Sequence, residues 1–295
     1  MSNYTKESIE YKGYRIEIVS DDDPQNPRTD WDPAGVMCAW HSRYNLGDMD
    51  RGKPISDSYS EPIDLLYELV GIGREAAQEE NYIKGIIRNL NEWLASKNKQ
   101  IETIPYDELY EFIGDYSYGR NYADEDDYSL YLVARFMEKT VYDRGCNHDD
   151  LSYSELYDRI DKRGTIILPL YLYDHSGITM STSSFSCRWD SGQVGYIYMT
   201  KETMEKEGWT KEQATNYLEG EVETYDQYLT GDVWGWRVID NDDDIVESCY
   251  GYYGNAGVED AIKEGKSTID YLCKKAQEEY EKTQPKRKAA EMYTI

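Results

Sequence analysis

The N-terminal region shows the alternation of apolar and polar side chains that is typical of half-buried strands. Residues 14–18 alternate in this way, and residues 36–40 repeat the pattern. An acidic turn at residues 21–24, Asp-Asp-Asp-Pro, ends the first segment. We therefore expect the two segments to pair as a small N-terminal β-hairpin.

Helical periodicity dominates the middle of the chain. Residues 63–80 and 82–96 carry an apolar stripe with a repeat of three to four residues, which is typical of amphipathic helices. Two further helices are expected near 106–114 and 127–143. Ser152 and Glu155 have the spacing of a capping box, so a short helix should begin there and end at Gly164.

The last third of the chain mixes strands and helices. Strands rich in Ile, Val, Tyr and Trp are expected at 166–173, 194–200, 233–240 and 245–253. Thr210 and Gln213 form a second capping box, which opens a helix with apolar positions from 214 to 229. A final helix over about 257–281 should end before Pro285.

These elements predict an α+β fold with a small N-terminal β-hairpin, a mainly helical middle and a C-terminal antiparallel sheet with helices. The expected domains are a β-rich segment at 1–60, a helical region at 61–164 and an α+β domain at 165–295.

Charge narrows the possible functions. The chain has 32 Lys and Arg against 58 Asp and Glu, a formal net charge of -26. A general DNA or RNA binder needs a positive surface to replace the counterions of phosphate, so we expect no direct nucleic-acid binding. The chain also holds 30 Tyr. This aromatic content favours a folded chain with contact-rich surfaces over an acidic disordered one.

The sequence predicts a cytoplasmic protein with no membrane segment. The start lacks the apolar core of a secretory signal, and the longest apolar run, 166–173, is too short to cross a bilayer. Five cysteines occur at irregular spacing, at positions 38, 146, 187, 249 and 273. We expect free thiols in a reducing compartment, with an intermolecular disulfide as the alternative.

No motif predicts catalysis, a metal or a cofactor. Residues 174–177, Asp-His-Ser-Gly, contain the letters of a hydrolase triad, but consecutive residues cannot converge on one proton path. Cys187 with His175 lacks the surroundings of a thiol protease. Residues 146–150 offer possible zinc ligands without a second cluster, and the acidic turns lack the spacing of a calcium loop. We therefore expect a protein that is not an enzyme.

The remaining signal is an interaction surface of acidic turns beside aromatic strands, the composition of many protein interfaces. Such an acidic surface suits basic clefts, including those that other proteins use for DNA. Ordinary acidic turns over core aromatics are the alternative interpretation. The predicted partner-binding residues are Asp124, Glu125, Asp126, Asp127, Trp234, Trp236, Asp242, Asp243, Asp244, Tyr250, Tyr252 and Tyr253.

In length, acidity, Tyr richness and general run of sequence the chain resembles the phage-encoded Gabija anti-defence family. The resemblance is greatest over residues 168–202, LPLYLYDHSGITMSTSSFSCRWDSGQVGYIYMTKE. It implies a non-enzymatic protein in the cytoplasm of the infected bacterial host. Members assemble as a homo-oligomeric shell, described as octameric, around the Gabija complex of a nuclease and a helicase-like subunit. The shell blocks DNA binding and cleavage.

Two other functions stay open. The first is an acidic DNA-mimic antirestriction protein that acts as a monomer or dimer. The second is a cryptic hydrolase that uses the region 174–187.

Overall fold

A computed structural model describes residues 4–96 and 150–292. Between these ranges it describes only the helical residues 107, 109, 110, 112, 113, 133 and 136. Side chains of the last helix are described as far as residue 282. The chain divides into two compact units. The first joins Met1–Ser58 to Ile166–Ile295, and the second is Tyr59–Thr165. The α+β fold class predicted from the sequence is confirmed.

The first unit contains an antiparallel four-stranded sheet with the order β1-β2-β9-β10. Its strands are β1 (Thr5–Tyr11), β2 (Tyr14–Ser20), β9 (Val233–Ile239) and β10 (Ile245–Tyr253). The N-terminal hairpin is formed by β1 and β2, so the expected pairing of 14–18 with 36–40 is wrong. The turn at Lys12 and Gly13 explains the difference. Both residues have positive φ, 49° and 79°, as in the tight two-residue turns that match the twist of a hairpin.

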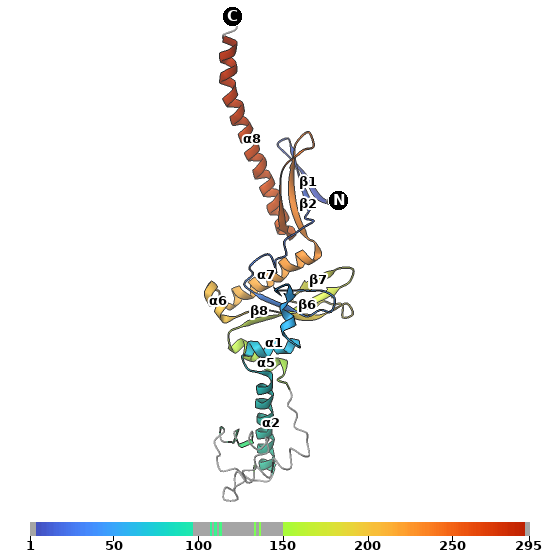
Figure 1. Ribbon diagram of the computed structural model, residues 1–295, viewed down its shortest axis with the longest axis vertical. Coiled ribbons are helices and arrows are strands. Elements are labelled where there is room, and N and C mark those ends of the chain that lie inside the picture. The colour runs from blue at the N-terminus through green and yellow to red at the C-terminus, as the bar shows by residue number, and fades with distance from the viewer. Residues whose placement is uncertain are drawn as a thin grey trace. The chain divides into compact units, whose positions relative to one another are not determined.

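Helix α8 (Gly254–Met292) packs on this sheet through Val258, Ala261 and Ile269. Figure 1 shows the helix running beside the hairpin. Gly265 permits a close approach, because a Cβ there would lie 3.1 Å from Cγ2 of Ile16. The helix continues past Pro285 to Met292, so its expected end before that proline is wrong. A proline removes one backbone hydrogen bond from a helix and bends it, and the helix can resume on the other side.

The first unit also contains a second antiparallel sheet with the order β3-β8-β6-β7. Its strands are β3 (Val36–Ala39), β8 (Ser191–Met199), β6 (Ile166–Asp174) and β7 (Ile178–Ser181). At Gly195 the chains approach so closely that a Cβ would lie 2.1 Å from the backbone oxygen of Cys38. Outside this sheet lie β4 (Met49–Asp50), β5 (Lys53–Pro54), the short helix η1 (Ile55–Ser58) and α6 (Lys201–Glu207).

Helix α7 (Lys211–Thr230) supplies the other half of this core. Leu218, Val222 and Tyr225 are buried against side chains of the sheet such as Leu170 and Ile197. The predicted capping box at its start is confirmed, since the Thr210 hydroxyl accepts from the Gln213 backbone N–H and Gln213 accepts from Thr210.

The second unit contains α1 (Pro62–Val70), α2 (Arg74–Ser96) and α5 (Tyr153–Lys162). The expected single helix over 63–80 is wrong. Helix α1 ends at Val70, where Gly71 follows as a cap with a left-handed φ of 74°, and α2 begins at Arg74 and continues through 82–96. The predicted Ser152 cap of α5 is confirmed. Of the helices expected near 106–114 and 127–143, only the scattered helical residues named above are described. In the described part of the chain, each helix is too short or too polar to span a membrane.

Candidate functional site: two grooves beside Trp31

The predicted partner-binding residues fall in three different environments. Asp124, Glu125, Asp126 and Asp127 lie outside the described residues. Trp234 and Trp236 are 9% and 2% exposed, within the core between the first sheet and α8. Their indole N–H groups donate to Asp232 at 2.6 Å and to the Tyr252 hydroxyl at 2.9 Å. The two indoles are therefore core side chains rather than surface anchors.

The second environment is the exposed turn between β9 and β10, which holds Asp242, Asp243 and Asp244. The carboxylate of Asp240 accepts the backbone N–H groups of Asp242 and Asp244 at 2.9 and 3.0 Å, which closes the turn. Asp243 has a φ of 64°, and its carboxylate accepts from Arg15 at 2.9 Å. The negative charge of Asp243 is thus partly neutralised by the guanidinium of Arg15 on β2.

The third environment is β10, where a bulge brings two predicted tyrosines to one side. The register shifts between Tyr250 and Tyr252, and Gly251 between them has a φ of 92°. Residues three apart in a regular strand point to opposite faces, and one extra residue restores them to the same face. Tyr250 and Tyr253 thereby line one groove, whereas the Tyr252 hydroxyl contacts Glu264 of α8.

We call this cavity the β10 groove; its volume is about 450 Å³. It is lined by Asp21, Asp23, Gln25, Trp31, Tyr250, Gly251 and Tyr253. The carboxylate of Asp21 accepts the Asp23 backbone N–H at 3.1 Å, and no ion pair joins either carboxylate to a cation among the described residues. Burial, together with the negative charges of Asp21 and Asp30, raises the pKa of Tyr253 to about 12. The groove is therefore both aromatic and negatively charged.

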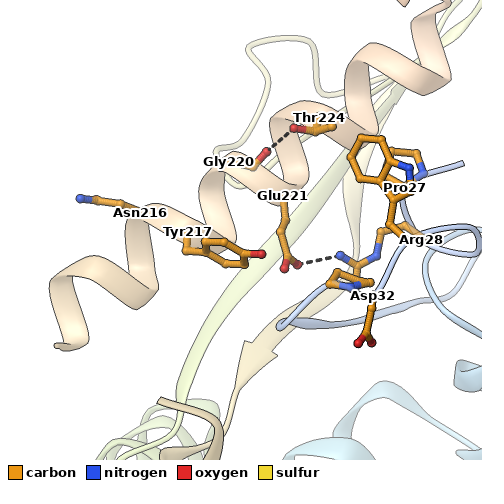
Figure 2. Close-up of a pocket in the computed structure, with 10 residues that line it drawn as sticks. Pro27, Arg28, Asp32, Asn216, Tyr217, Gly220, Glu221 and Thr224 are labelled. Carbon is orange, nitrogen blue, oxygen red and sulfur yellow. Dashed lines mark hydrogen bonds and ion pairs between the residues drawn. The ribbon is translucent and has the colours of Figure 1, made fainter. Parts of the chain in front are cut away.

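A second cavity, which we call the α7 groove, shares Trp31 in its lining and has a volume of about 410 Å³. Its walls include Pro27, Pro33, Tyr217 and Gly220. Figure 2 shows Tyr217 and Glu221 projecting from α7 toward the loop that carries Arg28. Trp31 is 44% exposed and lines both grooves.

Arg28 holds the loop of both grooves in place. Its side chain is 1% exposed and donates to Asp48 at 2.7 Å, to Glu221 at 2.6 Å and to the backbone oxygen of Gly35 at 2.7 Å. Burial alone would lower the pKa of Arg28, but the two carboxylates raise it above its usual value. Glu221 of the α7 groove is thus paired with Arg28, whereas Asp32, which also lines that groove, has no ion pair among the described residues.

The region considered for a hydrolase brings His175 and Cys187 to one carboxylate. Nδ1 of His175 lies 3.4 Å and Sγ of Cys187 lies 3.7 Å from the same oxygen of Asp190. In a nucleophilic triad the imidazole stands between the nucleophile and the carboxylate, because it must take the proton of the nucleophile. Here the carboxylate is the group that contacts both of the others.

Metal-ligand chemistry is sparse in the described part of the chain. No group of three or more His, Cys, Asp and Glu side chains there could hold a metal ion. Of the possible ligands at 146–150, only Asp150 is described, and it accepts two hydrogen bonds from Arg74 at 2.8 and 2.6 Å.

Sequence reasoning missed the site's central residue. Trp31 lies outside any alternating or helical pattern of apolar residues in the sequence. The acidic turn at 21–24 has the sequence of an ordinary solvent-exposed turn at the end of a strand. The tyrosines of β10 lie beside this acidic turn in the fold, but they are more than 200 residues away in the sequence. The sequence alone therefore gives no signal that the turn and the tyrosines form one site. No family model and no curated protein matches the sequence.

Proposed function

We propose that this chain is a phage counter-defence protein that binds and encloses the bacterial Gabija complex of a nuclease and a helicase-like subunit. It blocks DNA binding and cleavage by that complex and performs no catalysis. The observation that carries the proposal is the net charge of -26 together with an uncompensated acidic and aromatic groove. The resemblance to the Gabija anti-defence family supports the choice of target.

Charge complementarity gives the proposal its physical basis. Proteins that act on DNA present positive clefts to phosphate. An acidic protein is attracted to such clefts, and aromatic side chains at the contact supply buried area once the partners meet. Trp31 and Tyr250, at 44% and 39% exposed, are the described groove side chains best placed for this role.

The protein acts as a large homo-oligomer, up to an octamer, in the cytoplasm of the infected bacterial host, without direct contact to nucleic acid or membrane. A symmetric target presents the same surface several times, which suits a symmetric inhibitor. Linked copies also gain avidity, because each later contact becomes intramolecular.

The test combines inhibition with stoichiometry. Purified Gabija complex is incubated with the protein, DNA cleavage and DNA binding are measured, and native mass spectrometry gives the copies per assembly. We expect loss of both DNA activities and four or more inhibitor chains per complex. An unrelated nuclease serves as the control and should stay active. Full cleavage in the presence of excess protein would overturn the proposal.

The same net charge also favours an acidic DNA mimic that acts as a monomer or dimer. A mimic needs no large assembly and should inhibit several DNA-binding enzymes. One or two chains bound per target, with inhibition of the unrelated nuclease, would favour that function.

A further inference from the structure

We propose that the β10 groove binds the guanidinium group of an arginine side chain presented by a partner protein. This inference rests on the proposed function, because the DNA-binding surface of a nuclease complex displays such side chains. It adds a ligand class and a location to the blocking surface.

The aromatic walls of the groove are fixed before any ligand arrives. The Trp31 and Tyr253 rings meet edge to face, with centroids 5.1 Å apart. The Trp31 indole N–H donates to the Gln25 side chain at 2.9 Å, and the Tyr253 hydroxyl donates to the Gln25 backbone oxygen. Gln25 therefore holds both rings, so little side-chain entropy is lost when a planar group stacks on one of them.

The carboxylates are anchored through their backbones, while their charges are uncompensated. Asp21 donates its backbone N–H to Val233 at 2.9 Å, and one Asp21 oxygen accepts from Asp23. Arg237, a described cation beside Tyr250, already donates to the Tyr250 hydroxyl at 2.7 Å and lies 5.8 Å from that ring. An arriving cation would thus meet Asp21 and Asp23 without displacing an internal ion pair.

This combination selects guanidinium over ammonium. Guanidinium is planar and weakly hydrated, stacks on aromatic rings and donates to carboxylates through a rigid fork. An ammonium ion is compact and strongly hydrated, so it gains less from the ring faces. The α7 groove offers one carboxylate without an ion pair among the described residues, Asp32, because its Glu221 already binds Arg28. The β10 groove offers two such carboxylates, those of Asp21 and Asp23, which suits the forked guanidinium better.

The first measurement uses a short peptide probe and the full chain labelled with ¹⁵N-tryptophan. The probe is acetyl-Gly-Arg-Gly-amide, and its comparison peptide carries citrulline, which has the same shape without the charge. The Trp31 indole signal is assigned with Trp31→Phe. We expect saturable shifts of that signal with the arginine peptide and at least about tenfold weaker binding of the citrulline peptide. Equal binding of the two peptides, or no shift with either, would overturn the proposal.

The second measurement removes the charge from the groove. In Asp21→Asn/Asp23→Asn the side-chain oxygen at position 21 can still accept the backbone N–H of residue 23, so the turn is retained. We expect at least about tenfold weaker binding of the arginine peptide. The matched control, Asp242→Asn/Asp244→Asn, removes the same charge from the exposed β9–β10 turn and should change binding by less than about twofold. Equal losses in the two variants would show a net-charge effect and contradict a groove.

Inhibition of the Gabija complex separates this inference from the proposed function. If the natural protein inhibits and the groove variant inhibits equally well, the groove proposal fails while the function stands. If the natural protein binds the arginine peptide in the groove but leaves the complex active, the proposed function fails instead.

Discussion

The guanidinium of Arg28 donates to the carboxylate of Glu221 over 2.6 Å and joins two residues that are 193 positions apart in the sequence. The other Glu221 oxygen accepts the backbone N–H of Gly35 at 3.0 Å. Glu221 thereby fastens both ends of the loop segment 28–35 to α7. Trp31 lies within that segment, so the shape of both grooves depends on this ion pair.

Replacing Glu221 should destabilise the fold. Glu221→Gln keeps an acceptor for Gly35 but leaves the buried Arg28 with Asp48 as its single carboxylate partner. Breaking a buried pair costs about 3–5 kcal/mol, and we expect about 2–3 kcal/mol here because one partner remains. Urea unfolding measures the change. Glu219→Gln, on the exposed face of the same helix, is the control and should cost less than about 0.5 kcal/mol. Similar midpoints for the two variants would contradict the prediction.

Local signals in the sequence predicted local structure well. The capping boxes at Ser152 and Thr210 are both confirmed, because a cap is decided within four consecutive residues. Strand pairing was predicted poorly. Period-two alternation identifies a strand but not its neighbour, and β2 pairs with β9, more than 200 residues away, as well as with β1.

The candidate site was predicted only in part for the same reason. Tyr250 and Tyr253 were identified from an aromatic strand, but the bulge at Gly251 that brings them together depends on pairing with β9. Asp21 and Trp31 come from an irregular loop, and ion pairing of Arg28 with α7 and Asp48 holds that loop in place. No short-range pattern encodes such a contact.

Asp150 should stabilise the second unit in a pH-dependent way. Hydrogen bonds from Arg74, Tyr67 and Gln78 lower the pKa of Asp150 below its usual value of 3.8. A carboxyl group with a lowered folded-state pKa stabilises the fold above its unfolded-state pKa, and this contribution is lost as the pH falls through the folded-state value. We expect Asp150→Asn to cost about 1–2 kcal/mol at neutral pH.

The measurement is hydrogen exchange of peptides from α1 and α5 across the acid range. The difference between the natural protein and Asp150→Asn should be constant above about pH 5 and shrink below about pH 4. Asp158→Asn, an exposed change on α5, is the control and should leave exchange unaltered. A difference that grows as the pH falls would contradict the assigned role.

Removal of the candidate catalytic pair should leave counter-defence intact. His175 and Cys187 both contact Asp190, and the His175 side chain is 64% exposed. We expect His175→Ala/Cys187→Ala to stay folded by circular dichroism and to protect phage within about twofold of the natural protein in plating assays. Loss of protection with target binding retained would instead favour the hydrolase alternative.

Association with the target should slow as salt is added. The net charge of -26 produces a long-range attraction to a basic surface, and screening shortens to about 8 Å at physiological ionic strength. Stopped-flow or surface-binding kinetics should show an association rate that falls about tenfold between low and high salt, with a much smaller change in the dissociation rate. Asp21→Asn/Asp23→Asn should speed dissociation, because these two carboxylates contact the partner in the β10 groove only after docking. Asp242→Asn/Asp244→Asn should lower the association rate slightly and leave the dissociation rate unchanged. An association rate that is independent of salt would mean that shape, rather than charge, obstructs the DNA-binding surface.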